Sequence, residues 1–461
     1  MTTTDTTDAP PPSTPEATSG TTSLRPTAAL WQLARRVHFL AGLLVAPFLT
    51  VLALTGMIYA FTPQINDLLY GDVLYVDEQA ESSRPLSEQV DAAVNEHPDA
   101  KLSSVIVPED PERTTQVVLT GLPGLEDTGS RFSSESMTVY VDPYTGEVAG
   151  ELVTVNNRPP AQVWLRELHG NLNLGDPGRL YSEFVASWLP ILVLGGLVLW
   201  LRGRRKRTGL RGVVLPTGSG SGRAGVRSWH GALGVWLTVG LLAISVTGLT
   251  WSNYAGERVD AVVTALDGKR PRLPAPDVTA AAGAPVSIDR AVAIARSEGL
   301  TGELTIQPPS ETTAPYEVDE SSDGLPIRAT SIAIDPYEEK ITARQGWEDY
   351  PLPAKLTTLG IQAHSGTLLG LANQIAMATL ALGALVMLVL GYRMWWLRRP
   401  TTRTAAPIPA RLLRRLPMRV LVPLVVVTVA LGWAMPVFGV TLAGFVLADT
   451  AYQAVRRTSA V

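Results

Sequence analysis

The stretch VHFLAGLLVAPFLTVLALTGMIYAF, residues 37–61, has no charged side chain. It is long enough to cross a membrane as one helix, because a helix rises about 1.5 Å per residue and roughly 20 apolar residues span the hydrocarbon core. Residues 184–201, 229–250 and 368–396 have the same character. We therefore predict a multi-pass α-helical membrane protein with four long spans.

A fifth apolar block, residues 420–448, is too long for one ordinary span. Gly432–Trp433 and Pro436 interrupt it, and a proline removes a helical hydrogen bond. Two short spans joined near Pro436, or a re-entrant hairpin, both fit this pattern. We expect a C-terminal transmembrane hairpin that returns Arg456–Arg457 to the side on which the chain began.

Basic residues cluster beside the predicted spans. Residues 201–227 carry eight Lys or Arg and no acid, residues 393–419 repeat the pattern, and Arg35–Arg36 precede the first span. The positive-inside rule places these segments and both termini in the cytoplasm. The acid-rich segments near 64–179 and 253–362 then lie outside, and the first span, with no cleavable signal before it, is expected to direct insertion. The expected location is the bacterial cytoplasmic (inner) membrane.

The composition excludes several kinds of site. The 461 residues include no cysteine, which rules out disulfides, iron–sulfur clusters held by thiolates, thiolate zinc sites and covalently attached c-type haem. The net charge of −4 gives no reason to expect a nucleic-acid partner. Residues 1–28, rich in Thr, Pro, Ser and Asp, predict a disordered cytoplasmic tail.

Three groups of residues recur at nearly one offset, which predicts an internal duplication. Each copy is expected to contain a span, an outside segment and a second span. The recurring groups are His38, Gly42 and Thr55–Gly56 with His230, Gly234 and Thr247–Gly248; Asp142–Tyr144 with Asp335–Tyr337; and Leu168–His169 with Ala363–His364.

Each outside segment predicts one helix followed by a small antiparallel sheet. The helices are expected at 87–96 and 287–298, each with a serine at its N-cap. Alternating apolar runs predict strands at 103–107, 115–119, 137–141 and 147–152, and in the second copy at 303–307, 316–318, 329–334 and 340–343. The Asp-Pro-Tyr-Thr-Gly stretch predicts a turn between two strands.

These motifs resemble a known family. The stretch YVDPYTGEV at 140–148 is similar to a PepSY domain, although the second copy, DPYEE, lacks the turn glycine. LHGNLNLG at 168–175, WHG at 229–231 and HSG at 364–366, together with His38, resemble the PepSY-associated transmembrane proteins over roughly residues 30–455. That group includes iron-regulated membrane proteins and inner-membrane ferric-siderophore reductases. The resemblance implies an α-helical membrane protein with two small α+β extracytoplasmic PepSY-like domains.

Four of the five histidines lie at span edges, and His97 lies in a polar stretch where a solvated residue is expected. The topology sends His38 and His230 to the cytoplasmic side and His169 and His364 to the outer side. Two neutral imidazoles make a six-coordinate haem iron suited to electron transfer. We therefore expect two non-covalent b-type haems, one per face, with the histidines paired by face.

Glycines near the histidines support ligation, because a missing side chain leaves room for a flat porphyrin. Gly42 and Gly234 follow His38 and His230 by one turn, although small-residue packing is the simpler alternative. Trp188, Trp236 and Tyr59 are candidates for shortening the gap between haems. Arg35, Arg36, Arg227 and Arg179 are candidates for pairing with haem propionates, with topology-setting charge as the alternative.

The expected function is a haem-dependent membrane oxidoreductase with no catalytic side chain of its own. A cytoplasmic flavoprotein or a membrane quinol would supply electrons, and the resemblance implies ferric siderophore iron as the acceptor. Two alternatives remain: a non-enzymatic PepSY regulator or peptidase inhibitor, and an iron-uptake transport component. The scarcity of mid-span polar residues weighs against transport.

The expected division of the chain is a tail at 1–30, span 1 at 31–63, the first PepSY-like domain at 64–160, an outer histidine helix with span 2 at 161–202, a basic loop at 203–227, span 3 at 228–252, the second PepSY-like domain at 253–355, an outer histidine segment with span 4 at 356–398, a basic loop at 399–418 and the C-terminal hairpin at 419–455.

Overall fold

The computed structural model of the protein describes most of the chain. The predicted N-terminal tail, apart from its last residues, and most of the second basic loop lie outside the described part. The described ranges are 26–127, 134–217, 222–274, 278–279, 284–321, 329–397 and 416–458.

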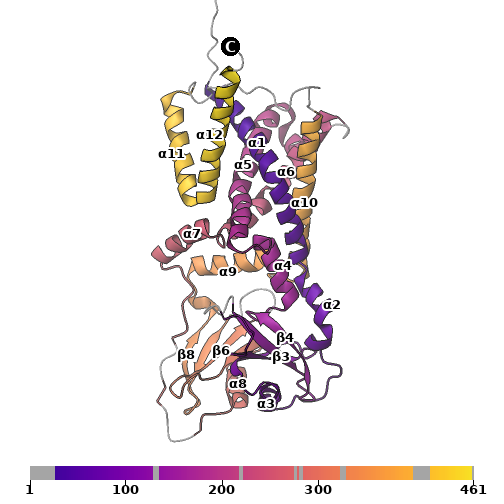
Figure 1. Cartoon of the computed structure of the whole chain (residues 1–461), viewed down its shortest axis with the longest axis vertical. Helices are drawn as coiled ribbons and strands as arrows, with labels where there is room; N and C mark the ends of the chain where they lie inside the picture. Colours follow the sequence, from indigo (N-terminus) through magenta and orange to yellow (C-terminus); the bar gives the residue numbers. More distant parts are fainter. Residues whose placement is uncertain are drawn as a thin grey trace, which may run out of the picture.

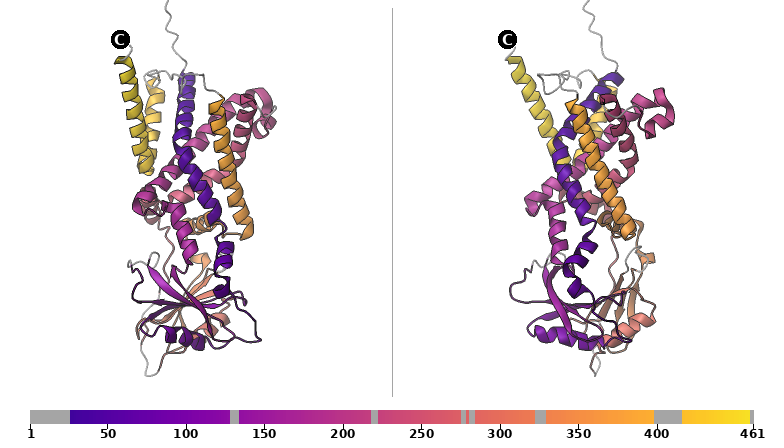
Figure 2. Two further views of the ribbon diagram at one scale, coloured as in Figure 1. Left: turned by 45° about the vertical axis from the view of Figure 1, so that its right-hand side comes forward. Right: turned by 90° about the vertical axis from the view of Figure 1, so that its right-hand side faces the viewer.

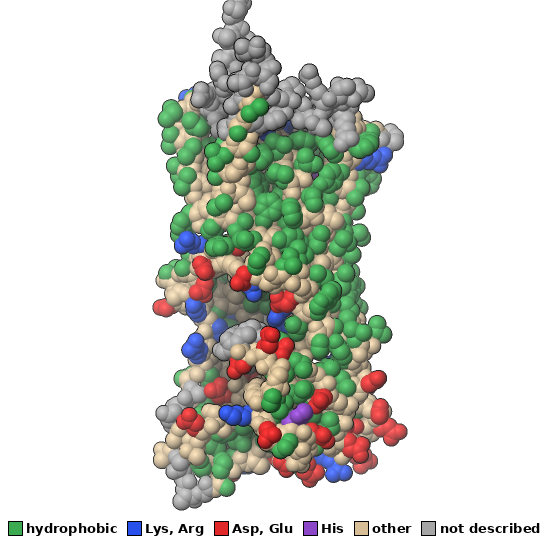
Figure 3. Space-filling view, viewed as in Figure 1, with side chains coloured by type: hydrophobic (Ala, Val, Ile, Leu, Met, Phe, Trp, Pro, Cys, Tyr) green, Lys and Arg blue, Asp and Glu red, His purple; other side chains and the backbone are tan. Residues whose placement is uncertain are grey.

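Four long apolar helices run side by side at one end of the molecule (Figure 1). They are α1 (Pro26–Tyr59), α5 (Asp176–Val214), α6 (Arg223–Leu249) and α10 (Leu371–Trp396), and each is long and apolar enough to cross a membrane. Apolar side chains cover this end, whereas acidic and basic side chains gather around the other (Figure 3). The four predicted spans are therefore confirmed by length and composition.

The four helices form a ring in which each packs against two others. Helix α1 contacts α5 and α10, and α6 contacts the same two neighbours. Consequently α1 and α6 lie diagonally across the bundle. Side chains that point to the centre from these two helices are therefore able to meet.

The last apolar block forms a helical hairpin of α11 (Met418–Ala434) and α12 (Pro436–Thr458). The break falls at Met435, beside Pro436, as the sequence predicted. A Cβ on Gly439 would lie 2.9 Å from the Gly432 Cα, so glycine at this position lets the two helices approach closely. Helix α12 packs on α5 and on α7 (Tyr254–Ala265), which begins where α6 ends.

A β-sheet lies at the opposite end of the molecule (Figure 2). It is antiparallel and has eight strands in the order β4-β3-β2-β1-β5-β6-β7-β8. Every strand that the sequence predicted overlaps one of these. The strands are β1 (Lys101–Val107), β2 (Thr115–Thr120), β3 (Glu135–Val141), β4 (Val148–Val155), β5 (Glu303–Gln307), β6 (Tyr316–Ser321), β7 (Ser331–Ile334) and β8 (Ile341–Gln345).

The two halves of the sheet are not separate domains, contrary to expectation. Strands β1 and β5 pair antiparallel, with Val105 opposite Ile306, and both side chains are fully buried. Helices α3 (Leu86–Glu96) and α8 (Ile288–Ser297) cover one face and share a single hydrophobic core with both halves. Left apart, β1 and β5 would each present an unpaired apolar edge, and joining them removes both edges.

The N-terminus of α3 also depends on the other half. Ser87 was predicted to cap this helix, but the N-cap position is Pro85, and the carboxylate of Asp289 in α8 accepts the backbone N–H groups of Leu86 and Ser87. The prediction for Ser287 is confirmed, because its side chain accepts the Arg290 N–H at the start of α8.

Two short helices return the chain from the sheet to the bundle. Helix α4 (Pro160–Asn171) follows β4 and leads into α5, and α9 (Leu352–Ser365) follows β8 and leads into α10. Each stops at a residue in the left-handed region, Leu172 with φ 59° and Gly366 with φ 85°. A histidine lies in the last turn of each, so both histidines are held at the junction of sheet and bundle.

The cross-half cap predicts that Asp289→Ala destabilises the sheet. Removing the acceptor leaves two N–H groups of α3 without their partner, which should cost about 1–2 kcal/mol. The measurement is the thermal unfolding midpoint of the detergent-solubilised protein. The control is Asp91→Ala, which removes an exposed carboxylate of α3 itself. Equal midpoints for the two variants would show that the cap contributes nothing.

Candidate site: two facing histidine pairs

The structure brings His38 of α1 and His230 of α6 together at the centre of the bundle. Their ring centroids are 6.4 Å apart, with an interplanar angle of 77°. These are the two diagonal helices of the ring, so the pair draws one imidazole from each half of the chain. This is the pairing that the topology predicted for the cytoplasmic side.

A second pair lies at the junction with the sheet. His169 of α4 and His364 of α9 have ring centroids 6.4 Å apart and an interplanar angle of 58°. Again each half of the chain contributes one imidazole, and again the pairing is the one expected. On α1, 17 residues separate His38 from Thr55, which contacts His169, so the two pairs lie on the order of 25 Å apart along the bundle.

One ring nitrogen of each inner histidine is fixed by a backbone carbonyl of the neighbouring span. The Nδ1 of His38 lies 3.0 Å from the Leu192 carbonyl oxygen of α5, and that of His230 lies 3.1 Å from the Met387 carbonyl oxygen of α10. A carbonyl oxygen only accepts, so Nδ1 carries the proton. The Nε2 lone pair therefore remains available to a metal ion.

The outer histidines reach the same tautomer through threonines. The Nδ1 of His169 lies 3.0 Å from Thr55 Oγ1, and that of His364 lies 2.8 Å from Thr247 Oγ1. Each hydroxyl donates its single proton to a carbonyl one turn back in its own helix, Val51 for Thr55 and Ala243 for Thr247. The hydroxyls therefore accept from Nδ1–H, and Nε2 is again free.

Burial keeps the outer pair uncharged. It lowers the pKa of His169 to about 4 and the pKa of His364 to about 4, against an ordinary value of 6.5. Both imidazoles are therefore neutral near pH 7. A neutral imidazole is the form that binds a metal ion.

Glycines on neighbouring helices make room for the imidazoles. A Cβ on Gly56 would lie 2.8 Å from His169 Cε1, and a Cβ on Gly196 would lie 2.8 Å from His38 Cε1. Gly248 and Gly391 stand in the corresponding places beside His364 and His230, with more space. Gly196 and Gly391 were not predicted as site residues, although their offset of 195 equals that of His169 and His364.

The glycines predicted to contact a porphyrin have a different position. A Cβ on Gly42 would meet the Leu192 side chain at 3.9 Å, and one on Gly234 would meet Met387 at 3.1 Å. Leu192 and Met387 are the residues whose carbonyls hold the inner imidazoles. Gly42 and Gly234 therefore face the side chains of these two residues and not an imidazole, and at Gly42 an added methyl group would have an ordinary contact distance.

Two aromatic side chains contact the outer pair. Tyr59 stacks on His169 with 6.4 Å between ring centroids, and Trp251 lies edge-on to His364 at 5.3 Å. They follow His38 and His230 by the same 21 residues, and this shared spacing is the sequence signal for Trp251, which was not predicted.

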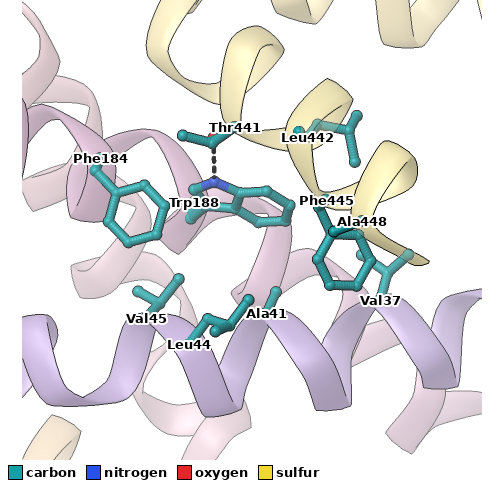
Figure 4. Close-up of a pocket in the computed structure, with 11 residues that line it drawn as sticks. Val37, Ala41, Leu44, Val45, Phe184, Trp188, Thr441, Leu442, Phe445 and Ala448 are labelled. Atoms are coloured by element: carbon teal, nitrogen blue, oxygen red, sulfur yellow. Dashed lines mark hydrogen bonds between the residues drawn. The ribbon is translucent and has the colours of Figure 1, made fainter. Parts of the chain in front are cut away.

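The other aromatic candidates face away from the bundle centre. Trp188 lines an apolar cavity of about 310 Å³ between α1, α5 and α12, where its Nε1 donates to Thr441 (Figure 4). Trp236 is 69% exposed and donates to the Val214 carbonyl. Neither position lies between the two pairs. His97 is also apart from them, since it bonds Glu151 in the sheet at 2.6 Å.

The spacing within each pair fits a single metal ion. Two imidazoles that bind one ion from opposite sides, each through a nitrogen about 2.0 Å away, have ring centroids about 6 Å apart. Among the described residues, no group of three or more His, Cys, Asp or Glu could hold an ion unaided. Each pair therefore suits an ion that brings its other ligands with it, as haem iron does.

Four apolar helices that could cross a membrane, with a sheet at one end, define a multi-pass membrane protein. The family model described as PepSY-associated TM region matches residues 35–398, and the chain belongs to this family. That match includes all four paired histidines. No curated protein matches the sequence significantly.

The threonine contacts predict a tautomer change in Thr247→Val. Loss of the acceptor should cost about 1 kcal/mol, or about fivefold in the tautomer ratio of His364. Nitrogen chemical shifts of selectively ¹⁵N-histidine-labelled, haem-free protein measure this ratio for each of the five histidines. Thr238→Val is the control, because Thr238 bonds the Gly234 carbonyl in the same helix. A His364 signal that is the same in both variants would refute the assignment.

Proposed function

We propose that the protein is a transmembrane electron conduit of the bacterial cytoplasmic membrane that holds two b-type haems. The observation that carries the proposal is the presence of two facing imidazole pairs, one in the span region and one beside the sheet, each with Nδ1 bonded and Nε2 free. Haem held between two imidazoles supplies a one-electron carrier that needs no proton or open coordination position.

In this proposal the chain acts by holding and orienting. His38 and His230 provide the axial nitrogens of the inner site, and His169 and His364 provide those of the outer site. The carbonyl and threonine partners fix each ring in one tautomer, which also raises its strength as a ligand. Because each site takes one imidazole from each half, the packing of the two halves sets the distance between the ligands.

The direction of electron flow follows from the proposed orientation. With the basic segments in the cytoplasm, the inner site would accept electrons from a flavoprotein or a membrane quinol. The outer site would pass them to an extracytoplasmic acceptor, which we propose to be ferric iron held by a siderophore. Reduction to Fe²⁺ weakens its binding to hard oxygen ligands and releases the metal from the chelate.

We also propose that the chain arose by internal duplication of a unit with a PepSY-like domain. The same order of elements occurs twice, as a span, two helices, four strands, a histidine helix and a second span. The strand order of the sheet is symmetric about the β1–β5 pair. The contacts of the inner site recur in the second half. Met387 and Gly391 of α10 contact His230 as Leu192 and Gly196 of α5 contact His38.

The proposal predicts two haems with separate ligand pairs. The purified protein should contain about two haems per chain and show a low-spin Soret band that shifts on reduction with dithionite. His38→Ala and His230→Ala should each reduce this to about one haem by removing the same spectral component. His169→Ala and His364→Ala should remove the other.

His97→Ala is the control and should retain both haems. A colourless protein that stays colourless after haem is supplied would refute the conduit. Loss of both haems from a single histidine change would refute two independent sites.

The glycine contacts predict a steric effect on haem content. Gly196→Ala places a methyl group against the His38 ring and Gly56→Ala places one against His169, and overpacking of this kind costs about 1–3 kcal/mol. We expect Gly196→Ala to weaken the inner site and Gly56→Ala the outer, measured as haem per chain by the pyridine haemochrome assay. Gly42→Ala, where the added group has ordinary contact distance, should retain both haems. A full complement in all three variants would contradict the role given to Gly56 and Gly196.

A further inference from the structure

A polar cleft of about 670 Å³ opens where the bundle meets the extracytoplasmic end. Its walls come from the start of α5, the end of α6 and one face of α7, and charged side chains gather around the hollow below α7 (Figure 3). The volume falls within the roughly 300–1,000 Å³ of small-molecule sites. Its lining residues include Arg179, Trp251, Ser252, Asn253, Glu257 and Asp260.

Trp251 connects this cleft to the outer histidine pair. Trp251 is one of the residues that line the cleft, and its ring lies edge-on to His364 with 5.3 Å between ring centroids. A molecule in the cleft would thus be separated from the outer imidazole pair by a single aromatic side chain. Tyr59 contacts His169 in a similar way but does not line the cleft, so the two outer imidazoles differ in this respect.

The walls of the cleft are held in place by buried interactions. Glu183 of α5 is 1% exposed, and its carboxylate accepts the backbone N–H groups of Tyr254 and Ala255 at the start of α7. A carboxylate at a helix N-terminus is also favoured by the helix dipole. Arg179 donates to Asn253 across the cleft at 3.3 Å. The cleft is therefore formed before any molecule enters it.

The charges that line the cleft nearly cancel. Arg179 carries a positive charge and Glu257 a negative charge, and Asp260 is paired with Lys269 at 3.1 Å. Such a lining offers hydrogen-bond donors and acceptors without a strong net field. It suits a polar ligand of little net charge better than a highly charged anion.

We propose that this cleft is the docking site of the electron acceptor, an iron(III) chelate of low net charge, and that Trp251 is the contact between it and the outer site. The inference rests on the proposed function. One electron passes from the reduced outer site to the chelated Fe³⁺, which gives Fe²⁺ and the oxidised site, with no bond or proton transferred. The electron comes from the flavoprotein or quinol donor in the cell and from dithionite in the test.

The experiment measures oxidation of the reduced, full-length haem protein by a neutral ferric tris-hydroxamate chelate in a stopped-flow instrument. Ala261→Trp fills the cleft from α7 without contacting a histidine. It should lower the second-order rate constant at least about fivefold and leave haem content and spectrum unchanged. Ala265→Trp on the same helix lies outside the lining and should react as the unmodified protein does.

A second comparison tests the aromatic contact. Trp251→Leu should slow oxidation by the chelate more than Tyr59→Leu, even though each removes an aromatic ring from one outer imidazole. The midpoint potentials of both variants, measured by redox titration, separate an altered driving force from a lost contact. A slower reaction of Trp251→Leu at unchanged potential supports the proposal, and equal rates for the two variants would refute the contact.

The possible failures are distinguishable. If the protein binds two haems and the chelate oxidises them equally fast in Ala261→Trp and Ala265→Trp, the cleft is not the docking site and the conduit stands. If the chelate does not oxidise the unmodified haem protein at all, a ferric chelate is not the acceptor. If no haem binds, the proposed function itself fails.

Discussion

The arrangement of the bundle depends on one kind of interaction: each of the four paired imidazoles has its Nδ1–H bonded to an acceptor on a neighbouring helix, which leaves Nε2 free. A buried imidazole N–H without an acceptor would lower the stability of the fold, and either tautomer of that ring could then form. The chain meets this need twice with a carbonyl in the middle of a span and twice with a threonine hydroxyl. Gly196 and Gly56 leave room for the rings of His38 and His169, and the last turns of α4 and α9 hold the outer histidines in reach of their threonines.

The same constraint explains why the two halves are joined so firmly. Each histidine is oriented by its own half, yet it faces a histidine of the other half. A small shift between halves would therefore change the distance between the rings without breaking any bond to Nδ1. The continuous sheet through β1 and β5, the shared core beneath it and the Asp289 cap on α3 oppose such a shift. The sheet therefore helps to fix the distance between the paired imidazole rings.

The two halves of the chain differ in how an aromatic side chain contacts the outer histidine. Tyr59 stacks flat on His169, whereas Trp251 meets His364 by its edge and also forms part of a cleft wall. The difference arises because α6 is followed by α7, which Glu183 holds against α5, whereas α1 is followed by α2 (Thr62–Leu74), which packs against α4 and β4. The two outer imidazoles thereby have different surroundings, and only His364 contacts a residue that lines the cleft.

The sequence by itself determined the spans, the strands and the grouping of four histidines into two pairs. Apolar length, charge bias and repeated offsets are local properties that tertiary packing does not override. It did not determine that the two sheets merge, since edge pairing between β1 and β5 depends on two segments about 200 residues apart. Nor did it reveal the partners of Nδ1, because a backbone carbonyl such as that of Leu192 has no sequence signature. Only the tertiary structure showed that Gly42 faces the Leu192 side chain while Gly196 faces the His38 imidazole. Gly42 lies one turn from His38 on the same helix, whereas Gly196 lies on α5, so only the packing of α1 against α5 decides which glycine the ring meets.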